Sequence, residues 1–225
     1  MSALVYRERP ADGEAEGLLI LHHGRGADEH DLIGLADVFD PDRRLHVVTP
    51  GGPLRVDGFP GRHWYTVPRV GYPDPDTFRS AFSALTAFHD ETWQRTGIGP
   101  DRTVLGGFSM GAVMSYSTGL AGDRPAPAGI MPFAGFVPVV EGWEASTADR
   151  RSMRAFIAHG RHDPIMAVSF AQEAAERLRA GGLDVEYHES DVDHRIDPGH
   201  ALAARAWLAG TLALPAVSDG GAGSR

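Results

Sequence analysis

Ser109 is the residue whose surroundings best suit covalent chemistry, because it is the centre of a G-x-S-x-G motif that runs from Gly107 to Gly111. The short apolar run Val104 and Leu105 precedes the motif, and an Ala/Val/Met-rich helical pattern follows it. A serine on a sharp strand-to-helix turn needs small neighbours, since two segments of backbone approach closely there. Its hydroxyl then stands beside helix N-terminal amides, which stabilise the negative charge that develops during acyl transfer. The motif therefore predicts a nucleophilic serine.

A serine hydroxyl alone is a weak nucleophile and needs a general base, most often a histidine oriented by a carboxylate. In hydrolases with this motif the chain order is Ser, then Asp or Glu, then His. Asp163 follows a predicted strand directly, and His194 lies between the last predicted strand and the last predicted helix. We predict Asp163 as the orienting acid and His194 as the base, with His200 as the second candidate for the base.

Other histidines and carboxylates are weaker candidates for these two roles. His188 lies within an alternating strand pattern, and His159 and His162 belong to the loop of Asp163 itself. Three further carboxylates are too close to His194 in sequence to be its expected partner: Asp191, Asp193 and Asp197.

Two more turns follow apolar runs and are expected to complete the site. Leu18 to Leu21 leads into the turn at His22 to Gly26, and Ala155 to Ala158 leads into the loop of Asp163. In open α/β sheets, ligand and catalytic groups collect at the carboxyl ends of the strands. We expect the backbone N–H groups of Arg25 and Met110 to form an oxyanion hole, the pair of donors that binds the developing charge.

A Gly/Pro-rich stretch from Pro50 to Pro75 has no clean period. Irregular segments of this length inside a compact domain are usually functional. We predict that it forms one wall of a substrate pocket, with Trp64, Tyr65 and Arg69 as lining residues. An ordered surface excursion held by a tryptophan is the alternative.

Apolar runs alternate with helical patterns along the chain, which predicts an α/β fold with a mostly parallel central sheet flanked by helices. We expect one catalytic domain over residues 1–214 and a flexible tail over 215–225. Strands are expected at Leu4–Tyr6, Leu18–Leu21, Leu45–Val48, Val104–Leu105, Ile130–Met131, Ala155–Ala158 and Val185–Tyr187. Helices are expected at Asp28–Val38, Asp76–Arg95, Ser109–Leu120, Ala167–Ala180 and Gly199–Leu212.

Four segments together resemble the phospholipase/carboxylesterase family of small α/β-hydrolases, to which acyl-protein thioesterases also belong. They are Leu21–Asp31, Gly107–Gly111, His159–Pro164 and His194–Pro198. The resemblance extends from about Gly17 to Leu212 and includes the tryptophan loop at His63–Tyr65. It implies an α/β-hydrolase fold without a large cap domain, the catalytic set Ser109, Asp163 and His194, and an oxyanion hole at Arg25 and Met110.

The resemblance also implies the activity: a serine hydrolase that cleaves carboxylic esters, with thioesters and lysophospholipids as further substrate classes. Two positions depart from the family pattern, since Met110 replaces a frequent Gln and Arg25 replaces a usually apolar residue. Arginines near the pocket (Arg25, Arg62 or Arg69) suggest the hypothesis of an acidic or polar acyl group. Surface arginines paired with nearby aspartates are the alternative.

Composition excludes several other kinds of chemistry. The chain has 225 residues, a formal charge of −9, no Cys and no Lys. Thiolate nucleophiles, Cys-based metal sites, Schiff bases and a P-loop lysine are therefore excluded. The net negative charge argues against nucleic acid as the main partner. We expect no metal and no cofactor, because no metal-ligand spacing such as H-E-x-x-H occurs.

Other classes and properties stay open at the level of sequence. A non-catalytic binding protein with the same fold, an acyltransferase and, less well supported, a metal-dependent hydrolase are the alternative functions. No apolar run approaches the roughly 20 residues that cross a bilayer, and the N-terminus lacks the layout of a signal peptide. We therefore expect a cytoplasmic location and no integral membrane segment. The sequence leaves homodimer formation undecided.

Overall fold

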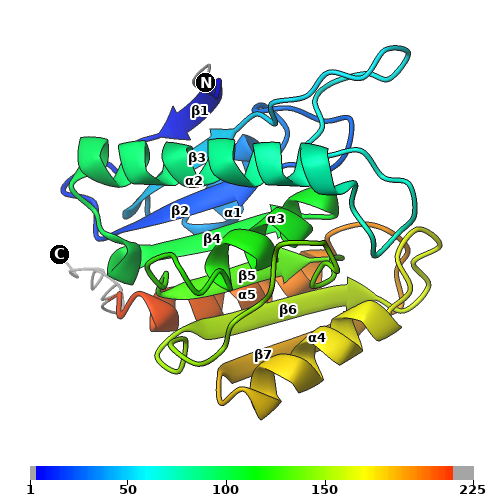
Figure 1. Cartoon of the computed structure of the whole chain (residues 1–225). Coiled ribbons are helices and arrows are strands. Elements are labelled where there is room, and N and C mark those ends of the chain that lie inside the picture. Colours follow the sequence, from blue (N-terminus) through cyan, green and yellow to red (C-terminus); the bar gives the residue numbers. More distant parts are fainter. Residues whose placement is uncertain (1–3, 215–225) are drawn as a thin grey trace, which may run out of the picture.

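A seven-stranded sheet in the order β1-β3-β2-β4-β5-β6-β7 forms the centre of the molecule (Figure 1). The computed structural model describes residues 4–214, so the expected tail at 215–225 lies outside the described residues. Only β1 runs antiparallel to its neighbour, and the other neighbouring strands are parallel. The strands are β1 (Tyr6–Arg9), β2 (Gly17–His22), β3 (Leu45–Pro50), β4 (Thr103–Phe108), β5 (Gly129–Phe133), β6 (Arg154–Gly160) and β7 (Asp184–Ser190). The expected α/β-hydrolase fold with a mostly parallel sheet is confirmed.

Helices cover both faces of this sheet. Figure 1 shows α2, α3 and α4 on one face, and α1 and α5 behind the other. The helices are α1 (Ala36–Phe39), α2 (Pro75–Thr96), α3 (Met110–Gly119), α4 (Ser169–Ala180) and α5 (Pro198–Thr211), with 3₁₀ turns η1 (Ile33–Leu35) and η2 (Pro100–Arg102). Four of the five expected helices agree with these bounds to within a few residues.

Alternate residues of the central strands enter two separate hydrophobic cores. In β2, Leu18 and Ile20 face the core under α2, α3 and α4, whereas Leu19 and Leu21 face the core under α1 and α5. All four are essentially inaccessible to solvent. Burying one such side chain contributes about 1.5–3 kcal/mol. This two-sided burial explains why the strand sequences are continuously apolar and not alternating.

The expected helix at Asp28–Val38 is wrong in length. The segment forms a turn, then η1, and then only the four residues of α1. The Asp28 carboxylate accepts a hydrogen bond from the His30 amide (2.9 Å), a local bond that competes with helix formation. Gly34 lies in the middle of the segment and has a low helix propensity. The segment therefore turns early after β2.

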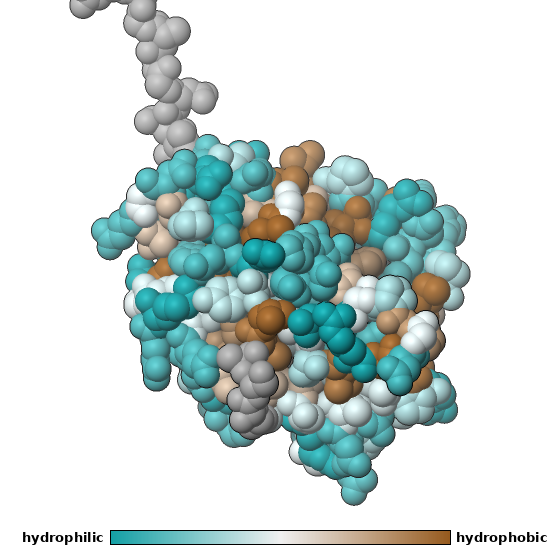
Figure 2. All heavy atoms as spheres, turned by 90° about the horizontal axis from the view of Figure 1, so that it is seen from above, coloured by the Kyte–Doolittle hydropathy of each residue, from teal (hydrophilic) through white to brown (hydrophobic). Residues whose placement is uncertain are grey.

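The surface visible in Figure 2 is mixed in character: apolar side chains form separate patches among hydrophilic ones. Exposed apolar side chains include Phe59, Tyr72, Val139 and Ile165. Among residues 4–214, no helix combines the length and the apolar character needed to cross a membrane.

Candidate active site

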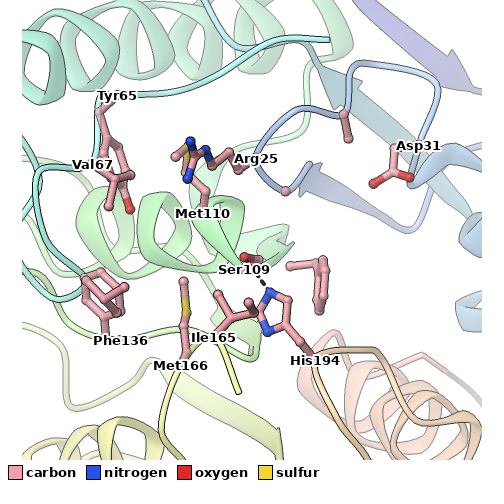
Figure 3. Close-up of a pocket in the computed structure, with 14 residues that line it drawn as sticks. Arg25, Asp31, Tyr65, Val67, Ser109, Met110, Phe136, Ile165, Met166 and His194 are labelled. Carbon is pink, nitrogen blue, oxygen red and sulfur yellow. Dashed lines mark hydrogen bonds between the residues drawn. The ribbon is translucent and has the colours of Figure 1, made fainter. Parts of the chain in front are cut away.

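A cavity of about 460 Å³ lies beside Ser109, where the loops after several parallel strands meet. We call it the Ser109 cavity. Figure 3 shows Ser109 and His194 side by side, with Arg25 and Met110 on one side and Ile165 and Met166 on another. Its lining consists of Gly24, Arg25, Ala27, Asp31, Tyr65, Val67, Val70, Phe108, Ser109, Met110, Phe136, Ile165, Met166 and His194.

Ser109 connects β4 to α3 in a strained backbone conformation, with φ 56° and ψ −119°. The two glycines of the motif permit this turn. A Cβ on Gly111 would lie 1.9 Å from the His22 carbonyl oxygen, and a Cβ on Gly107 would lie 2.6 Å from the Gly111 backbone. No side chain fits in either place, so the turn requires glycine at both positions. Ser109 is thereby placed at the start of α3, at the edge of the sheet.

His194 and Asp163 continue from Ser109 as a hydrogen-bonded chain. His194 Nδ1 lies 2.6 Å from Asp163 Oδ2, and His194 Nε2 lies 2.9 Å from Ser109 Oγ. An ionised carboxylate only accepts hydrogen bonds, so Nδ1 carries the proton and Nε2 is free to accept one from the serine hydroxyl. This is the arrangement in which an imidazole acts as general base toward a serine.

The Asp163 carboxylate is buried but well supplied with donors. Its Oδ1 accepts hydrogen bonds from the Ile165 and Met166 amides, both at 2.8 Å. Burial by itself raises the pKa of Asp163, but the Met166 amide, His194 and the Ile165 amide together hold it below its ordinary value. The carboxylate is therefore ionised at neutral pH. The fully buried His159 also lies against it, with Nε2 3.2 Å from Asp163 Oδ2.

Arg25 and Met110 both line the Ser109 cavity. Met110 is the first residue of α3, so its N–H has no acceptor within the helix. In the described part of the chain, the Arg25 N–H also has no hydrogen-bond acceptor. Two free amides beside a serine are the donors that an oxyanion needs.

Trp64, expected as a lining residue, does not line the Ser109 cavity. It is fully buried behind the cavity wall, where its indole Nε1 donates to the His23 carbonyl oxygen (2.9 Å). Its backbone N–H lies 3.3 Å from Met110 Sδ. Because a large apolar ring is most stable when buried, the side chain packs into the core and holds the turn that carries Arg25.

Arg69 also lies outside the lining, in contrast to the prediction. Its guanidinium stacks on the Tyr72 ring at 3.6 Å from the centroid, a cation–π contact at the surface. Tyr65 does line the cavity, together with Val67 and Val70 from the same stretch. The segment between Pro50 and Pro75 therefore does form one wall of the cavity. Of the three predicted lining residues, only Tyr65 belongs to this wall, and Val67 and Val70 complete it.

Several residues that line the cavity were not predicted from the sequence. Phe136 follows the end of β5, and Ile165 and Met166 follow Asp163 and Pro164 directly. The same rule that identified the other loops, a position just after the carboxyl end of a strand, would have included all three. Asp31, also in the lining, has a raised pKa because of desolvation and the nearby Asp28 carboxylate. Within residues 4–214, no group of three or more His, Asp or Glu side chains is placed to hold a metal ion.

Comparisons with known proteins give a consistent result. The model of a family described as Phospholipase/Carboxylesterase matches residues 8–211. The putative hydrolase MhqD of Bacillus subtilis is 27% identical over 195 residues, which cover 87% of this chain and 94% of that protein. Esterase YpfH of Escherichia coli is 29% identical over 193 residues, covering 83% and 79%. The crystal structure of esterase PE8 has a TM-score of 0.81 and 30% identity, covering 93% of this chain and 100% of that one.

Proposed function

Because the chain belongs to the phospholipase/carboxylesterase family, whose members hydrolyse esters, we propose that Ser109, His194 and Asp163 carry out its ester hydrolysis as a catalytic triad. The observation that carries this proposal is the unbroken chain of hydrogen bonds from Ser109 Oγ through His194 to Asp163. It opens on the Ser109 cavity, where the acyl carbon of an ester has room to approach the hydroxyl.

In the first half of the reaction, Ser109 Oγ attacks the acyl carbon while His194 Nε2 takes the hydroxyl proton. Asp163 stabilises the imidazolium that forms. The carbonyl oxygen becomes an oxyanion and is held by the Arg25 and Met110 amides. His194 then gives its proton to the leaving alcohol or thiol, which departs from an acyl-enzyme.

In the second half, water replaces the leaving group. His194 removes a proton from the water as it attacks the acyl carbon, and the second oxyanion uses the same two amides. Collapse of this intermediate releases the carboxylic acid and returns the proton to Ser109 Oγ. The cycle needs no group beyond these side chains, the two amides and water.

The test compares wild type with Ser109→Ala in the hydrolysis of p-nitrophenyl esters of graded acyl length. Removing the nucleophile is expected to lower kcat about 10⁶-fold, because triad members act as a unit. Labelling by a fluorophosphonate should also disappear in the variant. Hydrolysis that survives in Ser109→Ala would overturn the mechanism.

The same experiment separates the alternatives. A chain that only binds ligands would neither hydrolyse the esters nor react with the fluorophosphonate. An acyltransferase would form the acyl-enzyme and release p-nitrophenol, but turnover would depend on an added alcohol or amine acceptor. Steady turnover in water alone supports the hydrolase.

A further inference from the structure

Arg25 contributes the one permanent positive charge to the lining of the Ser109 cavity within residues 4–214. The residue belongs to the turn after β2, and its guanidinium lies 5.0 Å from the centroid of the Phe59 ring. In Figure 3 its side chain extends from this turn toward the side where Tyr65 and Val67 lie. The Arg25 guanidinium therefore lies at the edge of the mostly apolar wall of the Ser109 cavity.

The positive charge of Arg25 is not neutralised by an ion pair in the described part of the chain. Of the two other arginines considered from the sequence, one is neutralised by an ion pair and the other lies outside the cavity. Arg62 pairs with Glu29 (3.3 Å) and donates to the Gly52 carbonyl oxygen (3.2 Å), while Arg69 lies outside the cavity on Tyr72. Asp31 lines the same cavity but forms no ion pair with Arg25, and Figure 3 places it on the far side from Tyr65. Arg25 is thus available to an anion from outside.

The proposed mechanism decides which part of a substrate meets this charge. The leaving group must lie at His194 Nε2, from which it takes a proton, and the oxyanion must lie at the two amides. Arg25 lies across Ser109 from His194 (Figure 3). The acyl part of the substrate therefore extends away from His194, along the side of the cavity where Val67 and the Arg25 side chain lie.

We infer, on the basis of the proposed ester hydrolysis, that Arg25 binds a carboxylate at the far end of the acyl group. The preferred substrates are then monoesters of dicarboxylic acids, in which a short methylene chain separates the reacting ester from a free carboxylate. The methylene chain suits the apolar wall, and the planar guanidinium suits a carboxylate, to which it can donate two parallel hydrogen bonds. A long uncharged acyl chain would gain no such pair, and the exposed Arg25 guanidinium would keep only its hydrating water.

The test uses two substrates of equal chain length: p-nitrophenyl hydrogen adipate, which carries a free carboxylate, and its methyl ester, which does not. We expect wild type to have the higher kcat/KM with the charged substrate. Arg25→Gln keeps the backbone amide but removes the charge, and should lower the charged-to-methylated ratio of kcat/KM by about 2- to 5-fold, the effect of one solvent-exposed ion pair. Arg25→Lys should restore part of the ratio, because the charge returns without the planar fork.

Arg69→Gln is the matched control, since it removes an equally charged side chain outside the cavity and should leave the ratio unchanged. The ratio in wild type should also fall as salt is raised, because exposed charges are screened. A ratio near one in wild type, or the same ratio in Arg25→Gln, overturns the inference. If both esters are hydrolysed in a Ser109-dependent way without discrimination, only the role of Arg25 fails. If neither is hydrolysed and Ser109 is not labelled, the proposed function fails as well.

Discussion

Among the single residues of the site, Asp163 uses one carboxylate oxygen to hold its own loop and the other to bind His194. Its Oδ1 accepts the Ile165 and Met166 amides and thereby fixes the loop after β6, while its Oδ2 accepts from His194 Nδ1. The loop bonds hold the carboxylate in place and keep it ionised, so it can keep the imidazole in the tautomer that accepts the serine proton.

Asp163→Asn should therefore separate these two tasks. The amide oxygen can still accept the two loop amides, but the NH₂ group would face His194 and favour the tautomer with the proton on Nε2. We expect kcat to fall about 10³- to 10⁴-fold with little change in fold, measured with p-nitrophenyl esters and circular dichroism. Asp193→Asn is the matched control, because that carboxylate pairs with Arg195 at the surface. Equal losses in both variants would show that charge near His194, and not the hydrogen bond to it, is what matters.

Sequence reasoning grouped Ser109, His194 and Asp163 because motif, chain order and placement after strands constrain the three together, and the structure brings them into one hydrogen-bonded chain. Sequence reasoning predicted the pocket wall only in part: Tyr65 lines the cavity as expected, but residue type does not reveal which side of a loop faces the cavity. Trp64 and Arg69 both looked like pocket residues, yet one packs into the core and the other stacks on Tyr72. The positions of these side chains depend on the tertiary packing of an irregular segment. Such a segment has no helical or strand periodicity from which a buried face could be predicted.

Among the secondary-structure elements, the contact between α3 and β2 sets the position of Ser109, the proposed nucleophile. Helix α3 begins directly after Ser109, and its second residue, Gly111, lies against the end of β2. Any displacement of α3 from β2 would move the Ser109 hydroxyl and the Met110 amide together. The close contact between Gly111 and the end of β2 therefore supports the site, although it lies outside the cavity.

Gly111→Ala should disturb both stability and activity, because the added Cβ would lie 1.9 Å from the His22 carbonyl oxygen. We expect the free energy of unfolding to fall by about 1–3 kcal/mol or more, and ester hydrolysis to fall with it. Gly34→Ala in η1 is the control, since nothing lies within 4 Å of the added Cβ and the change should stabilise by about 0.4–1 kcal/mol. Urea denaturation measures both effects. A Gly111→Ala protein as stable and active as wild type would contradict the geometry of this turn.

The elements differ in how well the sequence predicts them. Strands β2 to β6 and the longer helices were predictable because two buried faces demand continuous apolar runs and because helices such as α4 show a clear apolar face. The expected edge strand Leu4–Tyr6 is shifted: β1 spans Tyr6–Arg9 and is mostly exposed, so no apolar run marks its bounds. The segment Asp28–Val38 was not, because the Asp28 side chain closes a local turn that pattern alone does not distinguish from a helix cap. Short-range hydrogen bonds of this kind decide boundaries that periodicity leaves undetermined.

At the scale of the whole molecule, buried neutral histidines are a feature of the core. His22 and His89 lie fully buried beneath the site, with 3.2 Å between their Nε2 atoms, and His22 Nδ1 lies 2.9 Å from Ser115 Oγ. Ser115 Oγ donates to the Gly111 carbonyl oxygen, so His22 Nδ1 donates to Ser115 and His22 Nε2 accepts from His89. Each proton in this chain has one acceptor, so a second proton on His22 would point its Nε2–H at the N–H of His89.

Acid should therefore destabilise the fold in the range where histidine titrates. Burial, together with the neighbouring histidine charges, lowers the pKa of His22, and burial and the charge of Arg124 lower that of His89 to about 3. Both stay neutral in the folded state while the unfolded chain takes up protons below about pH 6.5. Stability is then complete above that pH and falls below it, by about 2.7 kcal/mol per pH unit for the two together. The pKa values of three more histidines are lowered in the same direction: His23, His63 and His200.

Urea denaturation between about pH 7.5 and pH 5 measures the slope of the unfolding free energy against pH. The variant His89→Gln shows how much of this slope comes from His89. A glutamine amide can donate to His22 Nε2 as His89 does, but it binds no proton, so the slope should fall by about one half of the two-histidine contribution while the bond survives. His162→Gln is the control, because that side chain is 70% exposed and should leave the slope unchanged. A wild-type stability that is flat across this range would contradict the argument, since it would mean that the buried pair accepts protons as readily as the unfolded chain does.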